Sequence, residues 1–205
     1  MIYVENARYA TLTEPRMIRS VTWELPDWLF DELELERVLG SDEEKMALAI
    51  QIAERNVAHG GGPFGALVVD GATGRVVAPG ANLVVRHTCS LLHAEIVAIA
   101  FAQARLQSYT LAAGDYELIA SSDPCVQCLG AVHWSGFRRL ICGAPLAAAE
   151  SAGFDEGPRA EDWKEQLESR GVSVTERVLA DRATRVLSNY ARNGGLLYNA
   201  RDPRG

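Results

Sequence analysis

Two short stretches decide how the rest of the sequence is interpreted: Leu92–Glu95 (LHAE) and, beginning 31 residues after the histidine, Pro124–Cys128 (PCVQC). Imidazole nitrogen and thiolate sulfur are ligands that zinc prefers, and a catalytic zinc site has three protein ligands and one position left for water. His93, Cys125 and Cys128 form such a set. Two cysteines three residues apart at the start of a helix can face one metal ion, and the helix dipole there favours thiolates. The sequence therefore predicts a zinc site held by these three residues.

Glu95 is predicted to move protons rather than to bind the metal. Zinc lowers the pKa of water that it binds towards about 7, and a carboxylate beside that water can take its proton and pass it to a leaving amine. Zinc-dependent base deaminases divide the work in this way. A closed structural zinc site would need a fourth ligand, for which Cys89 and His87 have no evident place. A thioredoxin-type redox pair would leave His93 and Glu95 unexplained.

Composition limits the kind of protein that carries these motifs. The chain has 205 residues, a formal net charge of −7, four cysteines and a hydrophobic fraction of 48%. No stretch approaches the roughly 18 apolar residues of a membrane helix, and the N-terminus lacks the apolar run of a secretory signal. We therefore expect a cytoplasmic protein with reduced thiols and no membrane partner. Basic residues are scattered, which disfavours a polymeric nucleic-acid substrate.

Periodicity predicts an α/β fold of three layers on a central mixed sheet, because helical and strand-like segments alternate along the chain. Residues 1–40 are predicted to be an accessory segment, either a packing strap or a lid, and residues 41–205 the main domain. Ser41 and Glu44 form a capping box pattern before the first long helix. The predicted helices are 41–59, 93–106, 125–134 and 181–192; the predicted strands are 64–70, 75 onward, 83–85, 116–120, 139–142 and 172–178. Residues 145–172 are otherwise expected to be irregular.

At this point the chain resembles the cytidine-deaminase-like superfamily, and more closely its guanine deaminase branch. The zinc motif is specific for the superfamily, and Gly153–Glu156 (GFDE) points to the branch. The resemblance implies a cytidine-deaminase-like fold over residues 45 to the C-terminus. The matching stretches are Gly61–Ala66, Asn82, Leu92–Glu95, Pro124–Ala131 with Trp134, and Ala152–Pro158.

The resemblance also implies roles for single residues. Asn82 is similar to the amide that hydrogen-bonds the purine ring, and Phe64 to the face on which the base stacks. Ala94 and Trp134 are similar to residues that contact the substrate. Glu156 is similar to the second acidic residue of the branch, which contacts the amine region of the substrate and carries a proton.

Each role has an alternative at the level of sequence. Phe64 and Trp134 are also compatible with a hydrophobic core, Asn82 with a turn, and Glu156 with a solvated acidic loop. Members of the branch form homodimers in which C-terminal segments exchange and complete the neighbouring pocket. This draws attention to Tyr198, which is equally compatible with a hydrophobic anchor for the tail.

The favoured interpretation is a zinc-dependent hydrolytic deaminase that converts guanine to xanthine and ammonia, with Glu95 as proton shuttle and Glu156 assisting. The alternatives with the same chemistry are guanosine, cytosine, an ammeline-type triazine or a tRNA adenosine as substrate. The alternative of another class is a zinc-stabilised scaffold without catalytic activity. In the favoured interpretation the partners are a small nucleobase and a second copy of the chain.

Overall fold

Five strands form one sheet in the order β2–β1–β3–β4–β5 in the computed structural model, which describes residues 18–199. β1 (Gly65–Asp70) pairs antiparallel with β2 (Arg75–Ala81) and with β3 (Tyr116–Ser122). β3, β4 (Arg139–Ala144) and β5 (Ser173–Thr175) run parallel. The prediction of an α/β fold on a mixed sheet is confirmed.

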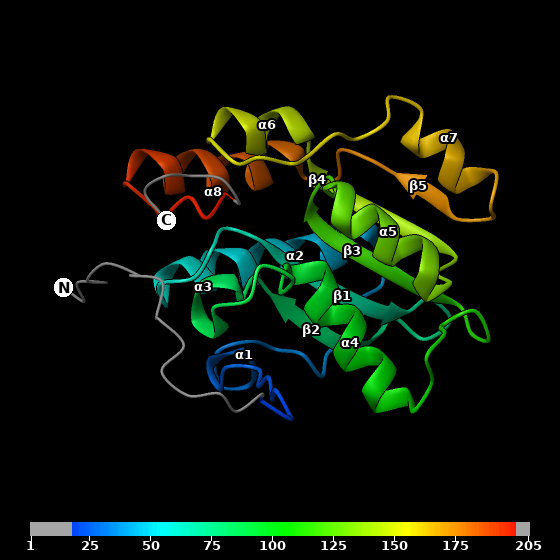
Figure 1. Ribbon diagram of the computed structural model, residues 1–205. Coiled ribbons are helices and arrows are strands. Elements are labelled where there is room, and N and C mark those ends of the chain that lie inside the picture. Colours follow the sequence, from blue (N-terminus) through cyan, green and yellow to red (C-terminus); the bar gives the residue numbers. More distant parts are fainter. Residues whose placement is uncertain (1–17, 200–205) are drawn as a thin grey trace.

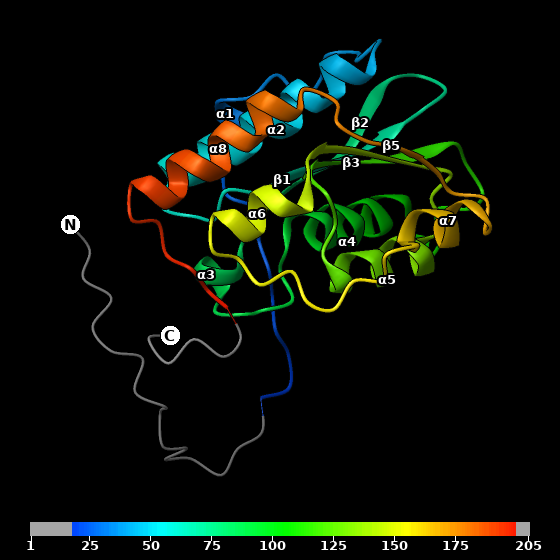
Figure 2. The same cartoon turned by 90° about the horizontal axis from the view of Figure 1, so that it is seen from above.

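Helices cover both faces of this sheet (Figure 1). α2 (Asp42–Ala58) and α8 (Ala180–Arg192) pack on one face, and α4 (Ala94–Leu106) and α5 (Val126–Ser135) pack on the other, as Figure 2 shows from above. Each face has its own cluster of buried apolar side chains. The three predicted layers are therefore present. No helix in residues 18–199 has the length and apolar character needed to cross a bilayer.

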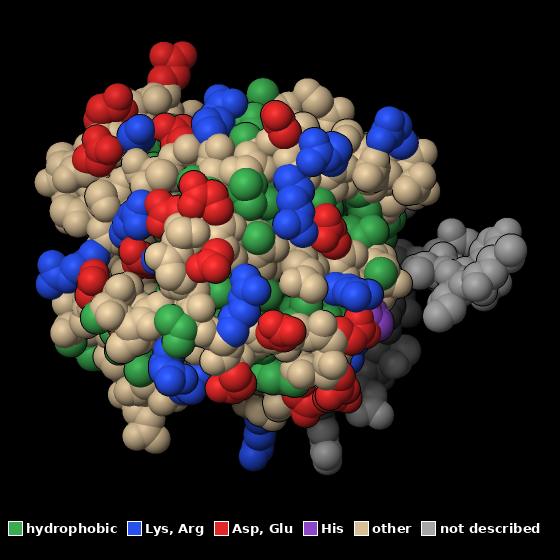
Figure 3. Space-filling model, turned by 180° about the vertical axis from the view of Figure 1, so that it is seen from behind, with side chains coloured by type: hydrophobic (Ala, Val, Ile, Leu, Met, Phe, Trp, Pro, Cys, Tyr) green, Lys and Arg blue, Asp and Glu red, His purple; other side chains and the backbone are tan. Residues whose placement is uncertain are grey.

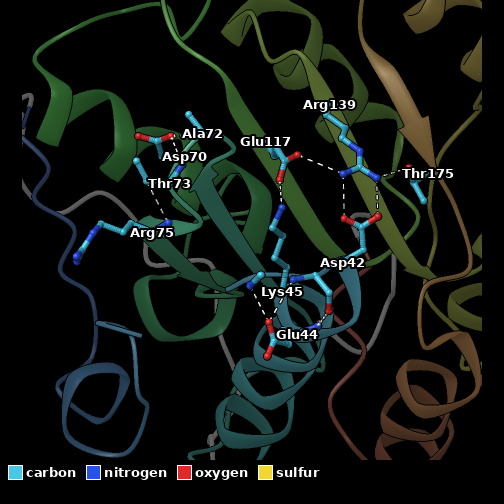
Figure 4. Close-up of polar contacts among 12 residues, drawn as sticks. Asp42, Glu44, Lys45, Asp70, Ala72, Thr73, Arg75, Glu117, Arg139 and Thr175 are labelled. Atoms are coloured by element: carbon cyan, nitrogen blue, oxygen red, sulfur yellow. Dashed lines mark hydrogen bonds and ion pairs between the residues drawn. The ribbon is translucent and has the colours of Figure 1, made fainter. Parts of the chain in front are cut away.

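One buried and one partly buried ion pair attach the first turn of α2 to the sheet (Figure 4). Lys45 is only 7% exposed, and its Nζ lies 2.5 Å from a carboxylate oxygen of Glu117 in β3. Arg139 in β4 contacts the same glutamate at 3.3 Å and binds the Asp42 carboxylate with its two terminal guanidinium nitrogens. Removing one partner of such a buried pair is destabilising, because the other charge stays buried without compensation.

The described part of the accessory segment contacts the domain mainly through one short helix. It contains α1 (Trp28–Asp31), in which Trp28 and Leu29 are buried. The Trp28 ring stacks on the ring of His59 at 5.2 Å, and Glu32 accepts a hydrogen bond from that histidine at 2.8 Å. Residues 18–24 are exposed, as is Phe30, so the choice between a strap and a lid stays a prediction. Residues 1–17 lie outside the described residues, and the boundary at residue 40 stays a prediction.

The predicted strand at residues 83–85 is wrong, since α3 (Val84–His87) occupies this position. Asn82 turns the chain after β2, because its side-chain Oδ1 accepts a hydrogen bond from the Val84 N–H at 3.3 Å. Asparagine favours such local turns. The β-branched pair Val84–Val85 suggested a strand, but the turn chemistry of the residue before it prevails.

Residues 145–172 also contain more structure than predicted, namely α6 (Leu146–Ser151) and α7 (Trp163–Glu168). The first is Ala-rich and begins where the Asp123 carboxylate accepts from the Leu146 N–H at 3.1 Å. The second buries Trp163 and Leu167.

The structure confirms the capping box of Ser41 and Glu44. It also confirms, with small shifts at their ends, the helices predicted at 41–59, 93–106, 125–134 and 181–192. The last strand is shorter than predicted.

Candidate active site

The three predicted metal ligands lie together where two helices begin. His93 immediately precedes α4, and Cys125 immediately precedes α5, in which Cys128 occupies the first turn. The His93 Nδ1 lies 3.4 Å from the Cys125 Sγ and 3.7 Å from the Cys128 Sγ. All three ligand atoms lie within 4.8 Å of one another.

This arrangement fits one zinc ion. Zinc–nitrogen and zinc–sulfur bonds of about 2.1 and 2.3 Å at tetrahedral angles place the nitrogen and sulfur about 3.6 Å apart, which agrees with the separations in this structure. Among residues 18–199 no fourth residue belongs to the cluster. Three ligands match a catalytic zinc site rather than a closed structural one.

Close packing of α4 on β2 brings the first helix to this place. A side chain at Gly80 in β2 would collide with the Ala94 carbonyl oxygen in the first turn of α4. Glycine therefore permits the backbone approach that sets the position of His93. Pro124 precedes Cys125 at the entry to α5, where a missing N–H costs little.

The electrostatics of the cluster favour a thiolate. The Cys128 thiol donates to the Cys125 sulfur and, together with His93 and against the effect of burial, lowers the pKa of Cys125 to about 4. The same contact and burial raise the pKa of Cys128 well above its usual value. Burial lowers the pKa of His93, but the hydrogen bond to Cys125 and the charge of Glu95 outweigh it, so the net direction is upward. Thiolates are the form of cysteine that binds metals.

A cavity of about 300 Å³ opens beside this cluster. Its walls include His93 and Cys125, together with two carboxylates that the sequence singled out, Glu95 and Glu156. A cavity of this size at a set of convergent polar groups is typical of a small-molecule site.

Glu95 is buried, with 8% of its surface exposed, and lies in the first turn of α4 two residues after His93. Burial raises the pKa of its carboxyl, and the charge of the Cys125 thiolate adds to that effect. A carboxyl whose pKa is raised in this way holds a proton more readily, as a general acid and base must.

Glu156 faces the same cavity and is also buried, at 9% exposed. Its backbone carbonyl accepts from the Val126 N–H at 3.1 Å, which ties the 153–157 loop to the start of α5. Burial raises the pKa of the Glu156 carboxyl to about 8, with the charges of Cys125 and Glu95 contributing. The alternative of a solvated loop glutamate does not describe this side chain. Its neighbour Asp155 is exposed.

Two of the predicted substrate-binding residues line the cavity, Phe64 and Asn82. The Phe64 ring packs edge-on against Phe154, with ring centroids 4.9 Å apart. Asn82 is 3% exposed and lies directly after β2. Together they form an aromatic and an amide side of the cavity.

The structure does not bring Ala94 and Trp134 to the cavity. Ala94 is 1% exposed and its side chain belongs to the hydrophobic cluster on the α4 face of the sheet. Trp134 is 81% exposed near the end of α5. The inner face of that helix carries Cys128 and Val132, so a residue two positions after Val132 points outward. The core alternative for Trp134 is wrong as well.

Sequence reasoning missed several residues that line the cavity. Asp123 is 5% exposed, and its Oδ1 has no hydrogen-bond partner in residues 18–199. Its place two residues before Cys125 was a usable signal. Phe154 lies inside the Gly153–Glu156 motif but was given no role there, and Asn199 has no comparable motif, because the tail that carries it meets the cavity only through the tertiary fold.

Tyr198 lies in the cavity of its own chain, and its ring centroid is 5.3 Å from that of Phe154. Asn199 beside it accepts from the Asp155 N–H at 2.9 Å and donates to the Gly153 carbonyl at 2.8 Å. The tail therefore holds the 153–157 loop within one chain. The homodimer with exchanged C-terminal segments stays a prediction. Cys89 is not among the residues that line the cavity.

Comparison with known proteins agrees with this geometry. Residues 39–144 match the family model for the cytidine and deoxycytidylate deaminase zinc-binding region. A solved structure of guanine deaminase from Nitrosomonas europaea superposes with a TM-score of 0.82 and 40% sequence identity, covering 86% of this chain and 99% of that one.

Two further similarities concern ligands and substrates of other proteins. A variant of the protein NE0047, solved in complex with 8-azaguanine, superposes with a TM-score of 0.82 at 40% identity over 87% of this chain and 99% of that one. A tRNA-specific adenosine deaminase from Haemophilus influenzae is 30% identical over 149 residues, which are 73% of this chain and 82% of that protein.

Proposed function

The chain belongs to the cytidine and deoxycytidylate deaminase zinc-binding family, and from this premise we propose that it hydrolyses guanine to xanthine and ammonia. The observation that carries the proposal is the pair of buried carboxylates, Glu95 and Glu156, which face one cavity beside the His93–Cys125–Cys128 cluster. The similarity to the Nitrosomonas europaea guanine deaminase supports the choice of base.

The reaction consumes one water molecule. A bond forms between the water oxygen and the ring carbon that carries the exocyclic amine, and the bond from that carbon to the amine nitrogen breaks. Zinc held by His93, Cys125 and Cys128 would supply Lewis-acid activation of water. Glu95 takes a proton from the attacking water and passes it towards the leaving amine.

The remaining groups bind the base and assist its departure. Phe64 offers an aromatic surface for stacking, and the amide of Asn82 offers a hydrogen bond to the ring. Glu156 contacts the amine as it leaves, so that ammonia departs with the proton that it needs. Each of these groups acts on the ring from a wall of the same cavity.

A tRNA substrate is the second candidate, because of the Haemophilus relative. The net charge of −7 argues against it, since binding of a polyanion depends on neutralising its phosphates. On the face shown in Figure 3, basic side chains alternate with acidic ones and form no continuous stripe. A small base is therefore favoured over a polymer.

Guanine is expected to have a higher kcat/KM than cytosine, guanosine, ammeline or adenosine in a tRNA stem-loop. The reason is Glu156, the second carboxylate in the cavity. Glu95 alone can serve the hydrolysis of an amine, and an acidic residue at the place of Glu156 is typical of the guanine branch. Ammonia release measured at equal substrate concentrations checks this. A higher kcat/KM for another member of the panel would move the chain to that substrate, and no ammonia from any member would favour the scaffold alternative.

Replacing Glu156 by glutamine is expected to lower kcat for guanine by roughly 100-fold, the size of a general acid–base contribution, with zinc content unchanged. The loss should appear in kcat more than in KM, because the contact strengthens as charge develops on the amine. Steady-state kinetics with metal analysis measure both. Asp155→Asn is the matched comparison, because Asp155 also lines the cavity but its side chain is exposed rather than buried, and it should change kcat less than about 3-fold. Equal, small effects of the two variants would remove Glu156 from the mechanism.

A further inference from the structure

A buried asparagine outside the cavity connects the two elements that carry the proposed base-binding groups. Asn56 lies in the last turn of α2 and is 3% exposed. We propose that Asn56 is a positioning residue for substrate binding, which sets the relative placement of Phe64 and Asn82. This inference rests on the proposed function of the cavity.

Both amide hydrogens of Asn56 are used to join two separate segments. The Asn56 Nδ2 donates to the Gly62 carbonyl at 2.8 Å and to the Asn82 carbonyl at 2.8 Å. The first acceptor belongs to the loop that leads into Phe64, and the second is the backbone of Asn82 itself. Among the described residues this amide nitrogen is the group that donates to both segments.

A direct backbone hydrogen bond completes the connection. The Asn82 N–H donates to the Phe64 carbonyl at 3.1 Å. Asn56 thus completes a small hydrogen-bonded network, which we call the polar frame. The network fixes the position of Phe64 relative to Asn82. Without the Asn56 donors, two buried carbonyl groups would lose partners, and the loop before Phe64 would be free to move away from Asn82.

The orientation of the Asn82 side chain depends on the same frame. Its Oδ1 accepts from the Val84 N–H at 3.3 Å, and no hydrogen bond within residues 18–199 engages its Nδ2. The side chain therefore presents an N–H donor to the cavity that it lines. A shift of the Asn82 backbone would misalign this donor with an acceptor on the base.

The Asn56 side chain also explains why glycine occupies position 61 in the loop before Phe64. A Cβ at Gly61 would collide with the Asn56 carboxamide, so only glycine fits there while Asn56 holds its position. The Gly61 N–H also donates to the Asn56 backbone carbonyl at 2.7 Å. Glycine at the start of the Gly61–Ala66 motif thus lets the backbone pass close to Asn56 before it reaches the cavity.

The test is a double-mutant cycle on the zinc-loaded full chain, with Asn56→Ala, Asn82→Ala and both together. We expect Asn56→Ala to lower kcat/KM for guanine by roughly 10-fold, the effect of losing one to two buried hydrogen bonds. Most of the change should be in KM, because the reacting groups at His93 and Glu95 are untouched. When Asn82 is already alanine, Asn56→Ala should lower kcat/KM by less than about 3-fold. The effects of two substitutions do not add when one residue acts through the other.

Two further variants distinguish a positioning role of Asn56 from a general loss of stability. Leu48→Ala removes another buried side chain of the same helix and leaves the Asn56 hydrogen bonds intact; it should lower the melting temperature with kcat/KM unchanged. Asn56→Ser keeps one donor and a small side chain, so it should fold where the alanine variant does not, with a loss in kcat/KM that is again smaller in the Asn82→Ala background.

Equal losses in both backgrounds, or wild-type kcat/KM in a folded Asn56 variant, would overturn the inference. The affinity for 8-azaguanine, measured by calorimetry over the same cycle, gives an outcome that does not require turnover. If the wild-type chain binds this base without deaminating guanine, the proposed function fails, while the cycle still shows whether Asn56 acts through Asn82.

Discussion

Glu95→Gln is expected to keep its zinc and to lose at least about 100-fold in kcat for guanine, and up to about 10,000-fold if one carboxylate serves every proton transfer. The amide preserves the shape of a side chain that is buried beside the metal cluster, but it cannot take or return a proton. Because Glu95 is not one of the three clustered ligands, metal analysis should find about one zinc per chain, as in the wild type.

Glu150→Gln is the control for this variant, since it removes an exposed carboxylate from α6 and should leave kcat within about 2-fold of wild type. A Glu95→Gln protein that keeps more than about a tenth of the wild-type kcat would show that another group carries the proton.

Cys125→Ser is expected to lose most of its zinc and on the order of 1,000-fold or more in activity, since Lewis-acid activation of water contributes several kcal/mol. The folded chain should also be less stable, because metal binding is coupled to folding. Metal analysis, a thermal melt and an ammonia assay measure the three effects on one preparation.

Cys89→Ser is the matched control, because Cys89 is a free, partly buried cysteine outside the metal cluster. It should bind about one zinc per chain and remain active. Full activity of Cys125→Ser with no zinc bound would contradict the assignment of the ligands.

Local chemistry explains why the metal cluster could be predicted from sequence. Cys125 and Cys128 lie three residues apart at the start of α5, so helix geometry turns both side chains towards one point. His93 is a ligand of the kind that completes such a zinc set, although its meeting with the two cysteines depends on the packing of α4. The capping box at Ser41 and the long helix behind it are predicted for the same reason, since both depend on residues that are neighbours in the sequence.

Features that depend on tertiary contacts could not be predicted in this way. The tail reaches the 153–157 loop through Asn199, which is 44 residues from Asp155. Trp134 matches a motif, yet the rotation of α5 around Cys128 and Val132 directs it to solvent. Asn56 has no motif at all, and its importance appears only when its two acceptors are found in segments that the fold brings together.

The substrate assignment is tested most directly by product analysis on guanine with the zinc-loaded protein. We predict one xanthine and one ammonia for each guanine consumed, at a rate that rises in proportion to bound zinc up to about one per chain. Guanine left unchanged by a fully zinc-loaded, folded protein would contradict the account.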